Sequence, residues 1–311
     1  MIITKTPLRI SLLGGNTDFP KYFKKNGGLC ITATIDKYVY CILKERFDKE
    51  IWINYSEKEK VKRVEDIKHN LVREAMKLVG VNEGVEITFL SDIPSEGSGL
   101  GSSSAVTIGL LNALHHYKNE VPTQMQLAEE CCRIERNILK NPIGMQDQFA
   151  IASGGSNLIK FHGKTVTVFK LNIDFERNMM LFYTGKTRNA NSILSKMKLN
   201  KKILDRTKFL AQLGVLASDD YYAFSSLLNT YWELKKKLNK SVSDKAIDKM
   251  YKKALRLGAT GGKIIGAGGG GFLFLLAPVE DQEHIRRNLG LKELPFKLSK
   301  YGSEVIFNIN G

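Results

Sequence analysis

A glycine- and serine-rich stretch, residues 94–105, separates an apolar segment from a helical pattern. The apolar segment Val85 to Leu90 has the composition of a strand, and the apolar residues after the stretch recur at the spacing of one helical face. Glycines let a backbone approach a ligand closely and adopt positive φ, and the first N–H groups of a helix have no partners within it. Those N–H groups and the positive end of the helix dipole attract anions, most often phosphate. The stretch therefore predicts a phosphate-binding loop and not a flexible linker, with contacts from Gly97, Gly99, Leu100, Gly101, Ser102, Ser103 and Ser104.

Two better-known phosphate loops do not fit this chain. In a P-loop, Gly-Lys is followed by Ser or Thr, but Gly262-Lys263 is followed by Ile264. A second glycine run, residues 266–271, matches the dinucleotide-binding pattern G-x-G-x-x-G, which must open a helix. The apolar residues 272–277 that follow it favour a buried strand instead. The His-Arg-Asp and Asp-Phe-Gly motifs of protein kinases do not occur in the sequence.

Three segments, in this order, resemble the signatures of one family, the GHMP kinases of small molecules. Residues 7–19 resemble its N-terminal signature, residues 97–105 its phosphate loop, and residues 266–271 its third, C-terminal glycine motif. The mixture of strand and helix patterns is typical of an α+β protein. The resemblance covers nearly the whole chain and implies a two-domain GHMP kinase fold. Residues 1–172 would form a nucleotide-binding domain of the ribosomal-protein-like βαβ type and residues 173–311 a ferredoxin-like domain, with the site between them.

Four further segments resemble the sugar-1-kinase branch of this family, above all its heptose 7-phosphate kinases: residues 141–149, 183–188, 232–235 and 258–263. The resemblance implies an ATP-dependent enzyme that phosphorylates the anomeric hydroxyl of D-glycero-D-manno-heptose 7-phosphate to the 1,7-bisphosphate. A fucokinase- or galactokinase-like enzyme for an unphosphorylated sugar is the alternative within the branch. A non-catalytic sugar and ATP sensor on the same fold is a third reading, but a sensor has no need to keep Arg9, Glu135 and Asp147 together.

Phosphoryl transfer requires a phosphate cradle, a divalent metal, positive charge on the transferred group and an oriented hydroxyl. The resemblance implies that Ser103 and Glu135 hold Mg²⁺ beside ATP, and this ion prefers oxygen ligands and keeps several waters. It also implies that Asp147 accepts or orients the proton of the acceptor hydroxyl, and that Arg9 stabilises charge in the transition state. Each residue has an ordinary alternative role: a helix N-cap for Asp147, a surface ion pair for Arg9, and a salt bridge at a helix rim for Glu135.

The pattern around Glu135 predicts a buried carboxylate. A helix is expected to start at Thr123, and Glu135 lies four residues after Cys131 on its apolar stripe. A carboxylate on the buried side of a helix needs a cation or a hydrogen-bond donor.

The first extended segment, Ile2 to Leu13, alternates apolar with polar residues. Arg9 is therefore expected to point away from the apolar set. A second extended stretch, Cys30 to Leu43, is predicted to form two strands that meet near Asp36-Lys37.

Residues 14–18 read Gly-Gly-Asn-Thr-Asp where galactokinases carry Gly-Glu-His-Thr-Asp. Loss of the Glu and His side chains opens space for a sugar longer than galactose, and Asp18 can still bind sugar hydroxyls. The predicted substrate contacts are Gly15, Asn16, Asp18, Arg188, Gly268, Gly269 and Gly270. Candidates for a distant phosphate on the sugar are Arg188, Lys186, Lys235 and Lys263, although each alone is more often a solvated cation.

The net charge of +15 could indicate a nucleic-acid partner, but the lysines are scattered and no nucleic-acid-binding motif occurs. The charge would instead steer anionic substrates, so the expected partners are a sugar phosphate and ATP, with no nucleic acid and no membrane. No apolar run reaches the roughly 18 residues of a membrane span, and residues 1–5 favour a strand over a signal peptide. The four cysteines lack C-x-x-C spacing, which favours free thiols in a reducing cytoplasm. The sequence leaves the oligomeric state open.

Overall fold

The N-terminal extended segment forms β1 (Ile2–Leu13), a central strand of the first of two sheets. The structure is a computed structural model that describes residues 1–93, 97–187, 190–197 and 199–309. Strand β1 pairs antiparallel with β2 (Gly28–Glu45) on one side and with β12 (Glu304–Asn308) on the other. The path continues from β2 through β5, β3 and β4, while β6 and β7 form a branch on β2. These strands are β3 (Ile51–Asn54), β4 (Lys58–Val61), β5 (Val85–Ser91), β6 (Ser156–His162) and β7 (Thr165–Lys170).

The stretch expected to be two strands is one strand of 18 residues, so that prediction was wrong. Residues 28–33 of β2 pair with β6, and residues 39–45 pair with β5. Along its other edge β2 follows β1, but the register shifts because Pro7 pairs with Tyr38 and Leu8 with Ile35. Asp36 and Lys37 are thus an irregularity within the strand at the point where β2 changes partner, and proline, which has no N–H to donate, is suited to that position.

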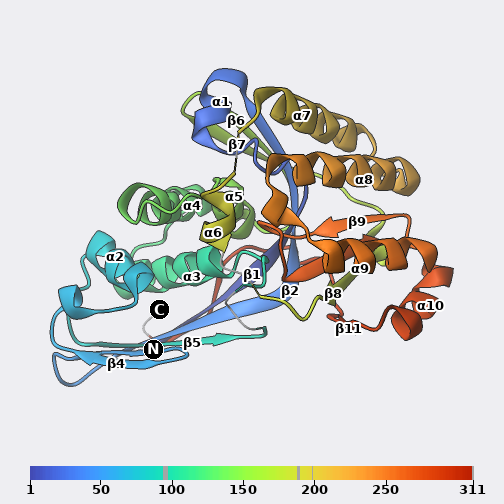
Figure 1. Ribbon diagram of the computed structural model, residues 1–311. Coiled ribbons are helices and arrows are strands. Elements are labelled where there is room, and N and C mark those ends of the chain that lie inside the picture. The colour runs from blue at the N-terminus through green and yellow to red at the C-terminus, as the bar shows by residue number, and fades with distance from the viewer. Residues whose placement is uncertain (94–96, 188–189, 198, 310–311) are drawn as a thin grey trace.

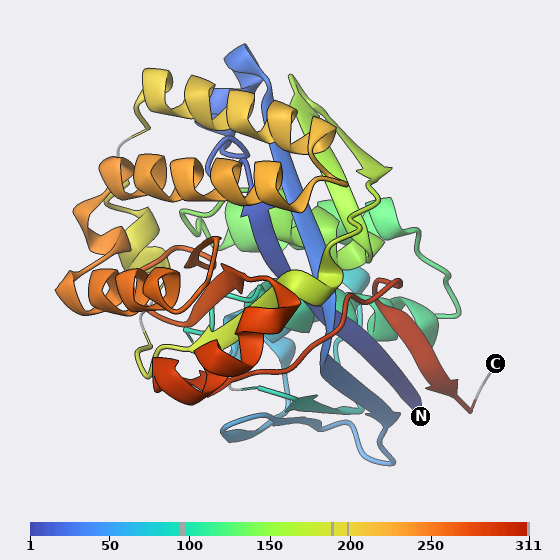
Figure 2. The same cartoon turned by 90° about the vertical axis from the view of Figure 1, so that its right-hand side faces the viewer.

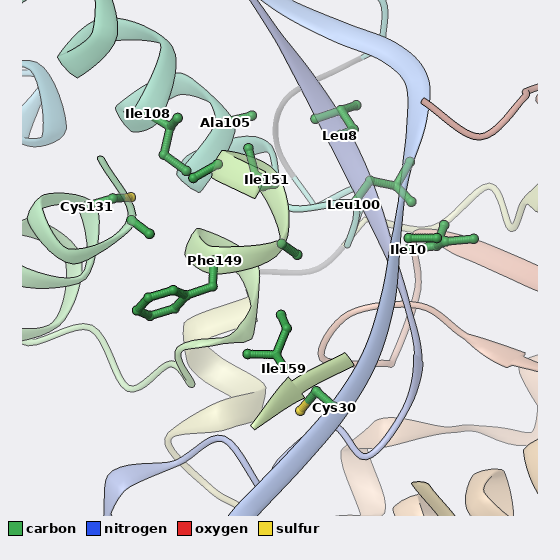
Figure 3. Close-up of a cluster of buried hydrophobic side chains, with 14 of the residues drawn as sticks. Leu8, Ile10, Cys30, Leu100, Ala105, Ile108, Cys131, Phe149, Ile151 and Ile159 are labelled. Atoms are coloured by element: carbon green, nitrogen blue, oxygen red, sulfur yellow. The ribbon is translucent and has the colours of Figure 1, made fainter. Parts of the chain in front are cut away.

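Helices α2 (Asn70–Val79), α3 (Ser102–Tyr117), α4 (Gln124–Cys132) and α5 (Gln146–Ser153) accompany the first sheet. After α4 the chain continues as a π-helical segment, Arg133–Ile138. Figure 3 shows one buried cluster in which side chains of these helices meet β1 and β6; it includes Leu8, Ile10, Ala105, Ile108, Cys131, Phe149, Ile151 and Ile159, all at most 1% exposed. Removal of a large member such as Phe149 by alanine substitution would cost about 3–5 kcal/mol of stability.

The second sheet is antiparallel, with strands in the order β11-β8-β10-β9. Its strands are β8 (Met179–Tyr183), β9 (Gly261–Ile264), β10 (Phe272–Leu276) and β11 (Lys292–Glu293). Helices α9 (Lys245–Arg256) and α10 (Val279–Leu289) and part of α8 (Tyr221–Leu238) share a second hydrophobic core with it, which includes Trp232, Ile247, Ile264 and Ile285. The predicted α+β class is thus confirmed, because helices pack on two sheets whose strands are mainly antiparallel.

The remaining helices are short or connect the two halves of the molecule. They are α1 (Pro20–Asn26), α6 (Ala190–Leu194) and α7 (Lys201–Leu216), together with 3₁₀ turns at Val64–Asp66, Glu176–Asn178 and Lys240–Val242. Figure 1 shows β1 and β2 running between α2, α3 and α4 on one side and the second sheet with α8, α9 and α10 on the other. Helix α7 packs on both α8 and β2, so it joins the two halves.

The chain ends in the first sheet, although it builds the second sheet before that. Figure 2 shows β12 lying beside the start of β1, and the preceding segment is tied to the first half by the bonds of Ser299 with Thr34 and Gly155. The boundary near residue 172 remains a prediction, to which this topology adds a C-terminal segment that returns to the first sheet. No helix in the described part of the chain combines the length and the apolar character needed to cross a membrane.

Candidate active site

A cleft of about 580 Å³ lies where the two glycine loops meet. It brings together most of the residues predicted from the sequence: Arg9, Gly15, Asn16, Asp18, Gly97, Gly99, Gly101, Ser102, Ser103, Ser104, Asp147, Gly268 and Gly270. Three predicted residues, Leu100, Gly269 and Glu135, are not among its lining residues, and Leu100 and Glu135 are fully buried. Arg188 lies outside the described residues.

The predicted phosphate loop opens α3 as expected. Gly97, Gly99 and Gly101 all have positive φ, between 69° and 81°, and helix α3 begins at Ser102. Within the described residues, no side chain caps the N-terminus of this 16-residue helix, and residues 101–104 line the cleft. The first N–H groups of a long helix therefore lie at the cleft without side-chain acceptors, which is the arrangement that binds an anion.

The two glycine loops touch at their backbones. A Cβ atom on Gly99 would come within 2.7 Å of the carbonyl oxygen of Ile265, and one on Gly266 within 2.7 Å of Gly99. Only glycine allows this approach, because both residues also have positive φ. The second glycine run thus packs directly against the phosphate loop. It follows β9 and leads into β10, the buried strand predicted after it.

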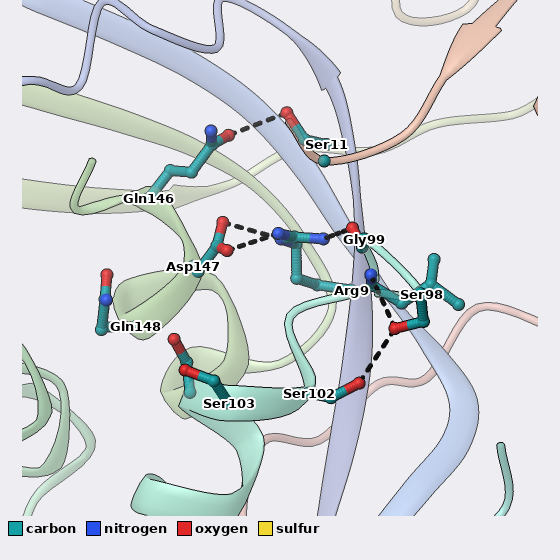
Figure 4. Close-up of polar contacts among 12 residues, drawn as sticks. Arg9, Ser11, Ser98, Gly99, Ser102, Ser103, Gln146, Asp147 and Gln148 are labelled. Atoms are coloured by element: carbon teal, nitrogen blue, oxygen red, sulfur yellow. Dashed lines mark hydrogen bonds and ion pairs between the residues drawn. The ribbon is translucent and has the colours of Figure 1, made fainter. Parts of the chain in front are cut away.

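Asp147 and Arg9 form a two-pronged ion pair in the wall of the cleft (Figure 4). The Nε atom of Arg9 donates to Oδ1 of Asp147 at 2.8 Å, Nη2 donates to Oδ2, and Nη1 donates to the carbonyl of Gly99 at 2.6 Å. Arg9 is only 4% exposed, so it is not a surface cation, and its alternation with buried Leu8 and Ile10 was predicted correctly. Asp147 lies in the first turn of α5 but is not its N-cap, which is Met145. The fork geometry fixes the carboxylate beside the phosphate loop.

Glu135 is fully buried in the π-helical segment, as the helical stripe predicted. It accepts hydrogen bonds from the hydroxyls of Ser103 and Ser104 and from Gln148 Nε2, the last at 2.5 Å. Burial raises the pKa of Glu135, and the three hydrogen bonds oppose that shift. Gln148 was not predicted, although its place directly after Asp147 in α5 puts it next to a site residue.

The oxygens of Glu135 and Ser103 fit part of a magnesium shell. Within the described residues, no group of three or more His, Cys, Asp or Glu side chains could hold a metal ion. One carboxylate and one hydroxyl in direct contact are hard oxygen donors, and Mg²⁺ commonly combines such a pair with waters and substrate phosphates. The residues therefore fit Mg²⁺ that arrives with a phosphate ligand, and not an ion caged by protein alone.

Asn16 and Asp18, which also line the cleft, have buried polar atoms without hydrogen-bond partners among the residues that the structure describes. Asn16 is 6% exposed and its Nδ2 has no hydrogen-bond partner; it also has φ of 74°, which is uncommon for a residue other than glycine. Asp18 is 1% exposed, and its Oδ2 accepts from the backbone N–H of Gln146 at 3.0 Å while Oδ1 has no partner. Burial raises the pKa of Asp18. Buried polar atoms are normally paired, so this donor and this acceptor indicate a polar ligand.

The three lysines that were expected to be solvated each form an ion pair or hydrogen bonds within the protein. Lys186 forms an ion pair with Asp244 at 2.6 Å. Lys263 is buried and donates to the carbonyls of Ser11 and Leu12, at 2.5 and 3.0 Å. Lys235 is also buried but lines the cleft, and it donates to the carbonyl of Gly266 at 2.5 Å. The expectation of solvated side chains was therefore wrong for Lys235 and Lys263.

Comparisons with known proteins agree with this geometry. Residues 68–155 match the family model "GHMP kinases N terminal domain" and residues 213–293 match "GHMP kinases C terminal". The chain is 32% identical to D-glycero-alpha-D-manno-heptose 7-phosphate kinase of Campylobacter jejuni, covering 88% of each sequence, and 26% identical to a galactokinase of Pyrococcus furiosus, covering 87% of each. The crystal structure of a D-glycero-D-manno-heptose 1-phosphate kinase from Bacteroides thetaiotaomicron has a TM-score of 0.81 at 25% identity, covering 99% of both chains.

A relative above 30% identity over most of both chains, two matched family models and the predicted two-domain fold all agree. The chain belongs to the GHMP kinase family and is an ATP-dependent kinase.

Proposed function

We propose that this kinase transfers the terminal phosphoryl group of ATP to the anomeric hydroxyl of D-glycero-D-manno-heptose 7-phosphate, giving the 1,7-bisphosphate. The observation that carries the proposal is the juxtaposition in one cleft of an anion-binding helix N-terminus and the unpartnered Asn16 Nδ2 and Asp18 Oδ1. The first feature suits the phosphates of ATP, and the second suits the hydroxyls of a sugar. Asp147 lines the same cleft, paired with Arg9.

Each residue of the site has a separate role in the proposed reaction. Asp147 orients the acceptor hydroxyl and takes its proton as the bond from the sugar oxygen to the γ-phosphorus forms and the bond to the ADP oxygen breaks. Arg9 stabilises the negative charge on the transferred group, because its guanidinium is already fixed between Asp147 and Gly99. Ser103 and Glu135 would hold Mg²⁺, which supplies further positive charge to the phosphates. The amides of the loop and of α3 hold the phosphates in place.

The choice of a heptose phosphate is supported by the similarity to the heptose 7-phosphate kinase of Campylobacter jejuni and by a difference from galactokinases at the sugar end, the part of the cleft that Gly15, Asn16 and Asp18 line. Gly15 lies against Tyr231, so that a Cβ atom there would come within 2.7 Å of the tyrosine hydroxyl. The glutamate of galactokinases would not fit at this position beside Tyr231, so the structure here differs from what that residue requires. The space that loss of the glutamate was expected to open for a longer sugar is filled, next to Gly15, by the Tyr231 hydroxyl. The names of the two heptose kinases differ in which phosphate the acceptor already carries, so the acceptor must be tested directly.

A kinase for an unphosphorylated sugar remains the second candidate. Asp18 is shared with galactokinases, and two cations expected for a distant phosphate, Lys186 and Lys263, are engaged by Asp244 and by backbone carbonyls. Arg188 is then the main candidate for a phosphate contact. We also propose a cytoplasmic location, which the four buried free thiols support because a reducing compartment keeps them reduced.

The test is ADP release with a panel of acceptors: heptose 7-phosphate, free heptose, galactose and fucose. A charge-assisted bond to a phosphate contributes about 1.5–3 kcal/mol, so heptose 7-phosphate should exceed the free sugars in kcat/KM by roughly 10- to 150-fold. Arg188→Ala should remove much of that preference. Equal rates with free heptose and its 7-phosphate would contradict the proposal and support the second candidate, while no ADP release with any acceptor would support the sensor.

A further inference from the structure

Lys235 is a buried lysine whose side-chain nitrogen, within the described residues, donates hydrogen bonds only to backbone carbonyls. It lies on α8, is 2% exposed, and donates to Gly266 O at 2.5 Å and to Ile264 O at 3.3 Å. No carboxylate is bonded to it within the described residues, although an ammonium group can donate three hydrogen bonds. A buried charge without a counter-ion is costly, so its position in the wall of a cleft calls for an explanation.

The position of Lys235 is the junction of the two glycine loops. Its main acceptor, Gly266, is the residue that touches Gly99 of the phosphate loop. Gly99 in turn accepts from Arg9. The two cations thus approach the same junction from opposite sides: Arg9 from β1 in the first sheet, and Lys235 from α8 beside the second.

The charged side chains near Lys235 carry more positive than negative charge, which favours binding of an anion. The nearby cations are Arg9, which lines the cleft, and Lys263, which does not; the nearby anion is Asp147, and Arg9 binds both of its oxygens. Burial, and then the Arg9 guanidinium, lower the pKa of Lys235 to about 7. A phosphate in the cleft would supply the negative charge that this cluster lacks and would favour the protonated lysine.

We propose that Lys235 is a second cationic residue of the reaction centre, which together with Arg9 binds the terminal phosphoryl group of ATP where the two glycine loops meet. The assignment rests on the proposed function, because it takes the ligand of the loops to be ATP. It gives the second half of the molecule a catalytic side chain. It also separates Lys235 from the lysines considered for a phosphate on the sugar.

The experiment is calorimetric titration of MgATP and, separately, MgADP into the full chain at pH 8, without acceptor, in two buffers of different ionisation enthalpy. Because the pKa of Lys235 is lowered to about 7, most of this side chain is neutral at pH 8, so binding of the terminal phosphoryl group should be accompanied by proton uptake. MgADP, which lacks that group, should take up markedly less. Lys235→Met should abolish the difference and weaken MgATP binding by roughly 10- to 150-fold.

The matched control is Lys236→Met, the same change at the next residue of α8. Lys236 pairs with Glu233 at 2.6 Å and does not line the cleft, so its variant should retain wild-type affinity and proton uptake. Equal proton uptake with MgATP and MgADP in the wild type overturns the assignment even if Lys235→Met does not fold, and so does wild-type uptake in a folded Lys235→Met variant. Failure of the wild type to bind either nucleotide overturns the proposed function as well, whereas normal turnover with unchanged binding in Lys235→Met overturns the inference alone.

Discussion

The buried carboxylates at the two ends of the cleft, Glu135 and Asp18, differ in how far their oxygens are satisfied without a ligand. At the phosphate end, where residues 97–104 meet Glu135, both oxygens of this carboxylate accept hydrogen bonds, from Ser103, Ser104 and Gln148, although the buried Oε1 of Gln148 is unpaired within the described residues. At the sugar end, Asn16 and Asp18 are also buried, but within the described residues each leaves one polar atom unpaired. An unpaired buried polar group costs about 1–3 kcal/mol, so the sugar end is held in an unfavourable state until a ligand fills it.

This difference separates general machinery from selectivity. A preformed phosphate end suits a ligand that every turnover shares, because the polar groups need little rearrangement before they bind. The sugar end has an unpaired donor and an unpaired acceptor, so it can discriminate among sugars. A substrate that lacks the matching hydroxyl leaves both groups unpaired. Substitutions at the phosphate end should therefore alter how the rate depends on metal and nucleotide concentration. Substitutions at the sugar end should alter how the rate depends on the sugar.

The largest effect is expected between the two ends, at Asp147. Asp147→Asn keeps the size of the side chain but removes the proton acceptor, so kcat should fall by about 10² or more while ATP binding changes little. The measurement is steady-state kinetics combined with nucleotide titration. The exposed Asp219→Asn serves as the control. Wild-type turnover by Asp147→Asn would rule out the assigned role.

A smaller effect is expected at the sugar end. Asp18→Asn keeps the shape but weakens a bond from a charged acceptor, so kcat/KM for the sugar should fall by about 10-fold while the KM for ATP is unchanged. A fall in ATP affinity of the same size would break the division between the two ends.

The same substitution has a predicted effect on stability. Burial raises the pKa of Asp18 above its unfolded value of about 3.9, so the unfolded chain releases its proton at a lower pH than the folded protein. The free energy of unfolding should thus fall with rising pH between those two values. In ligand-free Asp18→Asn this decline should be smaller and the protein at neutral pH more stable, as thermal unfolding at several pH values would reveal.

The smallest effect on rate is expected at the phosphate end, and it concerns the metal. Glu135→Gln should raise the Mg²⁺ concentration for half-maximal rate severalfold, because a carboxylate ligand is replaced by a neutral amide. The kcat at saturating Mg²⁺ should recover in part. Glu129→Gln, an exposed change on the preceding helix, is the control. An unchanged Mg²⁺ titration in folded Glu135→Gln would make Glu135 a structural residue that only anchors Ser103 and Ser104.

The phosphate end could be predicted well from the sequence because its signals are local. Glycines with positive φ, a helix that begins directly after them and a carboxylate on an apolar stripe each depend on neighbouring residues. Arg9 was also predicted, since alternation along one strand decides where it points.

The rest depends on contacts between distant parts of the chain. Lysine is normally solvated, and nothing near Lys235 or Lys263 in the sequence indicates that α8 and β9 bury them against the loop and β1. The division of β2 between β5 and β6, and the return of β12 to β1, are pairings across the chain with no local pattern. The unpartnered atoms of Asn16 and Asp18 likewise appear only when burial is known.

In the proposed reaction, the sugar end presents the anomeric hydroxyl of a heptose 7-phosphate to Asp147. Phosphorylation of heptose 7-phosphate at the anomeric oxygen and of heptose 1-phosphate at the far end of the sugar both give a 1,7-bisphosphate, so identification of the product does not test the claim. The most direct measurement is the initial rate of ADP release with each monophosphate at equal concentration. We predict rapid release with the 7-phosphate and none above background with the 1-phosphate, whose anomeric oxygen is already occupied. Equal or faster release with the 1-phosphate would contradict the account.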